Sequence, residues 1–240
     1  MKKIVAIICL AFIALNCNEE VKIDFEETAI ETEKNAKISI VIPKATGTVS
    51  VAKIINETLE HYIANLNTTD TISASESSLE NTVEKFDDDY LSFIKDFPEG
   101  SGKWEFFVDG EITYKTPELI TIAINSYSFT GGAHGNTIIR LFNFDAQTGK
   151  ALSKEDLISD LKTFSKIAEQ YFEEKTAPKN ELGTMQDYFY GEDFQWPETM
   201  GFNEEGVILL YNTYEIASYA EGITEFTIPY SDAESTLNFR

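Results

Sequence analysis

The sequence predicts an α+β protein of two small subdomains, each with a mainly antiparallel sheet packed against one or two helices. Three features of the 240 residues predict this class. Apolar residues recur at helical spacing in several stretches, strand-like runs lie between these stretches, and a glycine-rich reversal near the middle separates two halves. With 42% hydrophobic residues, a chain of this length can bury a core in each half.

The N-terminus has the pattern of an export signal. Two lysines precede an apolar run over residues 4–15, which is too short to span a bilayer but suits the core of a signal peptide. Cys9 lies inside this leader, so Cys17 would be the only cysteine after cleavage and could form no disulfide within the chain. The segment resembles a bacterial lipoprotein signal. We therefore predict a signal peptide over residues 1–16 and lipidation of Cys17.

The lipoprotein signal predicts a cell-envelope protein that is held by lipid on a bacterial membrane, the outer one in our interpretation. It would face the periplasm or the cell surface, with the lipid as its one contact with the membrane. Residues 17–36 are mostly charged or Thr, with few apolar positions, so we predict an acidic tether there.

The charge of the chain restricts its partners. The formal net charge is −22, and removal of the two leader lysines leaves 17 basic and 41 acidic residues, a charge of −24. Such a charge repels nucleic acid, whose binding requires Lys and Arg. It favours a cationic partner, although solubility alone is the commoner reason for an acidic surface.

The predicted N-terminal α+β domain spans residues 37–136. It begins with a strand over residues 38–42, which we expect Pro43 to end. Apolar residues at helical spacing then predict one helix over residues 51–66 and a second over residues 79–97.

Three consecutive carboxylates, Asp87, Asp88 and Asp89, lie within the second predicted helix. Consecutive helix residues point about 100° apart, so these side chains do not converge on one metal ion. We expect all three on a solvated face.

Strands follow in the rest of this half. An Asp109-Gly110 pair between two strand-like runs predicts a hairpin turn. In the next strand the apolar residues occupy even positions up to Ile124 and odd positions from Tyr127 onward. A bulge near residues 125–126 would place both sets on the core side.

A glycine-rich turn follows this strand. Gly131, Gly132 and Gly135 lie within five residues, together with His134. Because glycine adopts positive φ without a Cβ clash, we predict a tight reversal with at least one glycine at positive φ. A histidine in such a turn more often makes structural hydrogen bonds than it does chemistry. Tyr127, Gly131, Gly132 and His134 are nevertheless candidate ligand-binding residues.

The predicted C-terminal α+β domain spans residues 137–240. Ser153, with Asp156 three residues later, predicts a capped helix that continues to Phe172. Residues 207–211 are apolar without alternation, which predicts a central strand buried on both faces.

An irregular stretch over residues 176–198 contains an aromatic cluster among acids. Two interpretations are open, a recognition loop or a lid on the core. Under the first, Tyr188, Phe194 and Trp196 are further candidate ligand-binding residues.

The Thr-Gly-Gly-Ala-His-Gly run at residues 130–135 carries a family resemblance, supported by Phe144-Asp145, Thr148-Gly149-Lys150 and Tyr214-Glu215-Ile216. It is similar to a pair of adjacent bacterial envelope domains. These occur in the extracellular part of lysozyme-sensing anti-sigma factors of the RsiV type and in the N-terminal region of peptidoglycan deacetylases of the PdaC type. The resemblance covers residues 35–235 and implies a PdaC-like domain followed by an RsiV-like one.

The resemblance implies binding rather than catalysis. In the deacetylases the chemistry belongs to a separate metal-binding domain, and in the sensors the corresponding region binds lysozyme. The residues agree, because two histidines, no nucleophile elbow and no cluster of metal ligands leave few catalytic options. No metal or other cofactor is expected.

We therefore expect a non-enzymatic envelope lipoprotein that binds a cationic protein such as lysozyme, or peptidoglycan. Two alternatives remain open. One is a glycan-active hydrolase, which would need two carboxylates facing a cleft. The other is a purely structural surface module.

Overall fold

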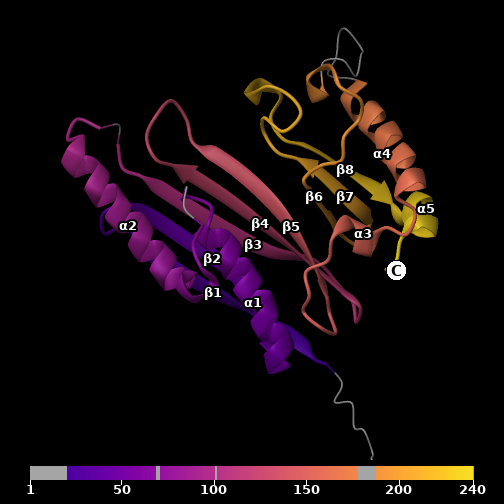
Figure 1. Ribbon diagram of the computed structural model, residues 1–240, viewed down its shortest axis with the longest axis horizontal. Helices are drawn as coiled ribbons and strands as arrows, with labels where there is room; N and C mark the ends of the chain where they lie inside the picture. The colour runs from indigo at the N-terminus through magenta and orange to yellow at the C-terminus, as the bar shows by residue number, and fades with distance from the viewer. Residues whose placement is uncertain (1–20, 69–70, 101, 178–187, 240) are drawn as a thin grey trace, which may run out of the picture.

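The computed structural model describes residues 21–68, 71–100, 102–177 and 188–239, which form two sheets with helices against them (Figure 1). The first sheet has the strand order β1-β2-β3-β4-β5, and the second has the order β6-β7-β8. The predicted α+β class is confirmed, since all neighbouring strands except β2 and β3 are antiparallel. No helix in these ranges combines the length and the hydrophobicity needed to cross a membrane.

The N-terminal half consists of the first sheet and two helices on one of its faces (Figure 1). Its elements are β1 (Ile23–Thr32), β2 (Lys37–Gly47), α1 (Val49–Ala64), α2 (Leu79–Asp96), β3 (Glu105–Lys115), β4 (Leu119–Phe129) and β5 (Asn136–Asp145). Because α1 and α2 form the crossover between β2 and β3, these two strands can run parallel. Both predicted helices are confirmed.

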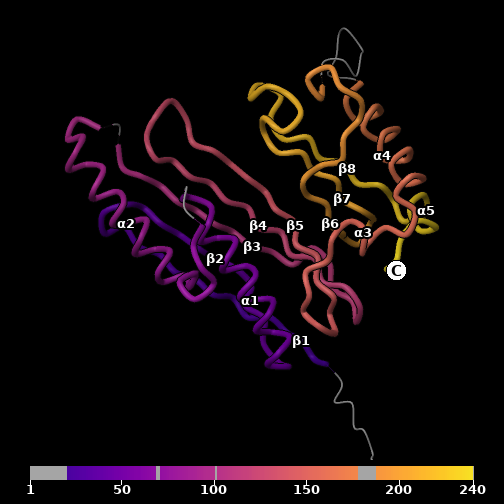
Figure 2. Tube along the Cα trace, viewed as in Figure 1, coloured from indigo at the N-terminus to yellow at the C-terminus, as the bar shows by residue number. Residues whose placement is uncertain are grey.

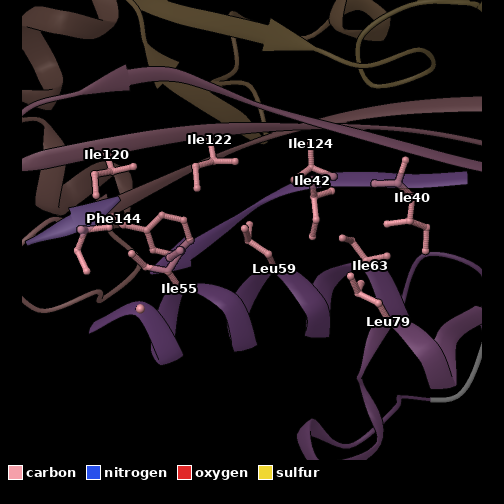
Figure 3. Close-up of a cluster of buried hydrophobic side chains, with 14 of the residues drawn as sticks. Ile40, Ile42, Ile55, Leu59, Ile63, Leu79, Ile120, Ile122, Ile124 and Phe144 are labelled. Atoms are coloured by element: carbon pink, nitrogen blue, oxygen red, sulfur yellow. The ribbon is translucent and has the colours of Figure 1, made fainter. Parts of the chain in front are cut away.

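The core of this half lies between α1 and the sheet (Figure 3). Ile55, Leu59 and Ile63 lie along one side of α1 and are almost fully buried. They face isoleucines at alternate positions of β2 and β4, namely Ile40, Ile42, Ile120, Ile122 and Ile124. Each such side chain contributes roughly 1.5–3 kcal/mol by leaving water, so this layer fixes the sheet against the helices.

The predicted tether is wrong from residue 23 onward, because β1 is a full strand paired with β2. Ile23 is buried, and Phe25 and Ile30 pack against the core. As the edge strand of the sheet, β1 has one solvated side and needs few apolar residues, which is why its composition resembles that of a tether. Residues 17–20, like the predicted signal peptide and Cys17, lie outside the described residues.

The predicted hairpin at Asp109-Gly110 is also wrong, because both residues lie inside β3. A Cβ added to Gly110 would lie 2.7 Å from Cδ of Pro43, so this glycine permits a close approach of two strands rather than a turn. Pro43 itself does not end β2. The pairing of β2 with β3 runs only to Val41, so the missing N–H of Pro43 breaks no bond to β3.

The phase change in β4 has a different cause from the predicted bulge. The pairing of β4 with β3 is regular at residues 125–126, and the register shift lies between Ile112 and Tyr114 of β3. β4 is apolar on both faces, because its even positions face the helices while Leu119 and Ala123 pack against the C-terminal half. Tyr127 continues this second face in a half-buried position.

β5 belongs to the first sheet, so this sheet extends beyond the predicted domain boundary after residue 136 (Figure 2). The glycine-rich turn connects two paired strands of one sheet, β4 and β5, rather than two domains. The first sheet ends at Asp145, and the C-terminal half begins with the turn that follows.

The C-terminal half packs helices against the second sheet. Its main elements are α3 (Lys154–Leu157), α4 (Leu161–Thr176), β6 (Thr199–Phe202), β7 (Gly206–Tyr211), β8 (Thr224–Pro229) and α5 (Tyr230–Ala233). The predicted central strand is confirmed, since every residue of β7 is buried. The Ser153–Asp156 capping box is also present, but its helix ends at Leu157 and Asp160 caps a separate helix, α4.

Asp87 is buried, contrary to the expected solvated face. Its carboxylate accepts hydrogen bonds from the backbone N–H groups of Ala36, at 2.8 Å, and Asn35, at 3.2 Å, and from Nδ2 of Asn35 at 2.6 Å. Burial alone would raise the pKa of Asp87, but these hydrogen bonds, together with Lys34, lower it overall. The carboxylate thus ties the β1–β2 turn to α2.

Candidate functional site

The two halves meet along β4 and β5, where a small apolar cluster joins the sheets. Ala123 and Leu141 of the first sheet pack there against Ile208 and Leu210 of β7. Polar side chains cross the same boundary: Nδ2 of Asn143, for example, donates to the carbonyl oxygen of Met200 at 2.8 Å. The contact therefore fixes the β4–β5 turn relative to the loops of the C-terminal half.

The glycine-rich turn has the predicted geometry. Gly131 and Gly132 adopt φ of 97° and 108°, which confirms the prediction of positive φ in this turn. Gly135 lies against the ring of Tyr127, where an added Cβ would overlap the ring. Tyr127 in turn stacks on Phe107 of β3, with ring centroids 5.8 Å apart, so it connects the turn to the sheet.

His134, at the tip of this turn, reaches the C-terminal half. Its ring stacks on that of Tyr219, with centroids 4.3 Å apart and planes 27° from parallel. Its Nδ1 lies 2.9 Å from the carbonyl oxygen of Gly135, which can only accept, so Nδ1 is the donor. Tyr219 also contacts Tyr214, with centroids 5.6 Å apart. The two halves thus share one aromatic surface.

Three tyrosines of this surface are large apolar side chains exposed to solvent. Tyr190, Tyr214 and Tyr219 are 68%, 53% and 46% exposed. The hydroxyl of Tyr190 lies 2.8 Å from the carbonyl oxygen of Tyr214 and donates to it. Together with His134, these residues form what we call the tyrosine surface.

The backbone beneath the tyrosine surface is strained. Phe189, Tyr190 and Tyr214 have φ of 54°, 55° and 70°, and among the described residues no other residue except glycine has positive φ. Each such conformation costs on the order of 1–3 kcal/mol, and residues held in such conformations cluster at functional sites in proteins. The fold therefore holds Tyr190 and Tyr214 in place at a cost to stability.

Three predicted ligand-binding residues near Tyr190, namely Tyr188, Phe194 and Trp196, lie in the core instead of on the tyrosine surface. Tyr188 is 1% exposed and contacts Phe172 edge to face, so it is a core residue. Phe194 and Trp196 are half-buried against the same core, where Trp196 stacks on Phe164. These three residues support the lid interpretation. Of the predicted ligand-binding residues, the structure places His134 on the tyrosine surface, and Tyr127, Gly131 and Gly132 support it.

Several carboxylates lie within three residues of the three exposed tyrosines along the chain. Glu192 and Asp193 follow Tyr190, Glu221 follows Tyr219, and all three are exposed. Glu215, next to Tyr214, is partly buried, and burial raises the pKa of its carboxyl group. Exposed carboxylates therefore lie close to the exposed tyrosines along the chain.

The described residues contain no group of three or more His, Cys, Asp or Glu side chains that could hold a metal ion. Carboxylates line two hollows. Glu31, Glu33 and Asp109 line an open one of about 420 Å³ over β2 and β3, and Glu60 and Glu80 line a cavity of about 110 Å³ beside α1. Burial raises the pKa of Glu60, and Glu80 adds to this shift. Ligand pockets usually measure about 300–1,000 Å³, so the cavity beside α1 is too small to hold a glycan chain.

Comparisons with known proteins identify both halves. Residues 30–137 match the family described as "Deacetylase PdaC", and residues 150–231 match "Protein of unknown function (DUF3298)". A curated relative, the peptidoglycan-N-acetylmuramic acid deacetylase PdaC of Bacillus subtilis, is 26% identical over 131 residues. This match covers 48% of the chain but only 25% of that deacetylase.

Two solved structures share the fold. A DUF3298 family member from Bacteroides fragilis superposes with a TM-score of 0.65 at 18% identity, covering 90% of this chain and 93% of that one. A DUF3298 family protein from Pseudomonas aeruginosa gives 0.63 at 18% identity, covering 91% and 95%. The chain therefore combines a segment similar to the PdaC family with a following segment similar to the DUF3298 family.

Proposed function

We propose that this chain is a non-catalytic binding module of the bacterial cell envelope, and that its ligand is a cationic protein such as lysozyme. The observation that carries the proposal is the tyrosine surface, to which both domains contribute. The faces of tyrosine rings attract Lys and Arg side chains, and exposed aromatic residues often dominate binding energies.

The charge of the chain supports the same ligand class. The net charge is −22, and opposite charge speeds the encounter of two proteins. The envelope location is supported by the relative that acts on peptidoglycan, and in this proposal the lipid on Cys17 holds the module at the membrane.

The absence of catalysis is part of the proposal. The two carboxylates whose pKa is raised lie in surroundings unlike the cleft of a hydrolase. Glu215 accepts two backbone hydrogen bonds, and Glu60 lines the small cavity beside α1. A hydrolase would need two carboxylates facing a cleft wide enough for a sugar chain.

A combined assay tests this function. We expect immobilised protein to retain lysozyme but to release neither acetate nor reducing sugar from peptidoglycan. Release of either product that disappears with Glu60→Gln, but persists with the exposed control Glu57→Gln, would establish the hydrolase alternative. Retention of peptidoglycan fragments without lysozyme would make the glycan the ligand.

A further inference from the structure

The free edge of β5 is covered by side chains instead of a strand. The amide of Asn212 pairs with both backbone groups of Ile139: Oδ1 accepts from its N–H at 2.8 Å, and Nδ2 donates to its carbonyl oxygen at 2.9 Å. Two residues further along, the N–H of Leu141 donates to Oγ1 of Thr199 at 2.7 Å. These contacts place hydrogen bonds at every second residue of β5, as a neighbouring antiparallel strand would, and they cross the boundary between the two halves.

One carboxylate orders both segments that provide these side chains. Oε1 of Glu215 accepts the N–H of Glu198, the residue before Thr199, at 2.7 Å. Oε2 of the same group accepts the N–H of Asn212, also at 2.7 Å. Hydrogen bonds to a charged acceptor are worth about twice as much as neutral ones, so Glu215 holds the two segments firmly.

The same short loop carries two residues of the tyrosine surface, Tyr214 and Tyr219. Tyr214 lies between Asn212 and Glu215, and Tyr219 follows four residues later. The loop is tied to β5 through Asn212, and β5 leads back to the turn that carries His134. Any slip of the loop along β5 would therefore separate the stacked rings of His134 and Tyr219.

We infer that Asn212 and Glu215 are positioning residues, which act as a latch that holds the two halves of the tyrosine surface in register for the ligand. The inference rests on the proposed function for the identity of that ligand. The geometry of the latch is independent of it, because the bonds to Ile139 can be measured without any ligand.

Hydrogen exchange and binding, measured on the same protein, test the latch. In Asn212→Ala the amide proton of Ile139 should exchange roughly fivefold faster or more, because it loses the acceptor of its hydrogen bond. The amide of Ile40, in the core strand β2, should exchange as before. The affinity for lysozyme should fall about fivefold to tenfold.

Asn203→Ala provides a matched control. The Asn203 side chain likewise makes two hydrogen bonds to the backbone, but in the β6–β7 turn, where its Oδ1 accepts the N–H groups of Glu205 and Gly206. This variant should leave both the exchange at Ile139 and the affinity unchanged. Asn212→Asp keeps the acceptor for the Ile139 N–H but loses the donor, so it should protect that amide while affinity remains reduced.

The outcomes separate the two proposals. Unchanged exchange at Ile139 in Asn212→Ala would overturn the latch, whatever the ligand. Faster exchange with wild-type affinity would show that the register does not matter for binding and would also overturn the inference. A wild-type protein that binds no lysozyme, with the exchange pattern as expected, would refute the proposed function and leave the latch geometry standing.

Discussion

Replacing Tyr219 with alanine should weaken lysozyme binding by roughly 30-fold, because loss of a central aromatic anchor typically costs 2 kcal/mol or more. Tyr219 is 46% exposed and lies between His134 and Tyr214, so its removal opens the middle of the tyrosine surface. Half of its side chain is already solvated, so the fold should lose little stability. Titration calorimetry gives the affinity, and thermal unfolding checks the fold.

Tyr90→Ala is the matched control for this variant. Tyr90 lies on α2, on the helix-covered side of the first sheet, and packs against Trp104 instead of the tyrosine surface. It should change stability but not affinity. If Tyr219→Ala binds like wild type while Trp196→Ala binds weakly, the ligand contacts the lid of the C-terminal core, and the tyrosine surface is not the site.

Asp87→Ala should lower the free energy of unfolding by roughly 3 kcal/mol at neutral pH, since removing one partner from a buried charged network is strongly destabilising. The change removes three hydrogen bonds and leaves the buried N–H of Ala36 without its acceptor. Urea unfolding of the two proteins measures the difference.

The difference in stability between wild type and Asp87→Ala should decrease as the pH falls. The pKa of Asp87 is lowered in the folded protein from its ordinary value of 3.8. Its contribution is therefore complete above that value and is lost as pH falls through the lower, folded pKa. The gap between wild type and Asp87→Ala should be constant near neutrality and shrink in acid.

Asp88→Ala, one residue further along the helix, is the control, because Asp88 is exposed. It should change stability by no more than about 0.5 kcal/mol at any pH. A stability gap for Asp87→Ala that widens in acid would show that the carboxylate is not ionised and hydrogen-bonded as described.

The apolar pattern of the sequence predicted both a helix buried along one face and a strand buried on both faces. The helix stripe around Ile55 and Leu59 and the apolar run of β7 are both confirmed, because burial of apolar area decides their structure. Edge strand β1 and Gly110 were misread for a physical reason. An edge strand needs few apolar residues, and a glycine that permits close packing looks the same in sequence as one that permits a turn.

The candidate site was predictable only in part. His134 was found because glycines surround it, and glycine density has a local conformational meaning. Tyr190, Tyr214 and Tyr219 were missed, although Tyr214 precedes Glu215 and Tyr219 lies two residues before Glu221. Their exposure depends on contacts between residues far apart in sequence, such as the pairing of Asn212 with Ile139 across 73 positions. No local pattern records such contacts.

Calorimetry with lysozyme and with a second basic protein of equal charge, at low and high salt, tests the central claim most directly. Charge attraction alone is screened over about 8 Å at physiological ionic strength, so it gives weak binding that salt abolishes. We expect lysozyme to bind more tightly than the control, and to remain bound at high salt with reduced affinity. Equal binding of the two proteins at low salt, lost for both at high salt, would contradict a specific site for a cationic protein.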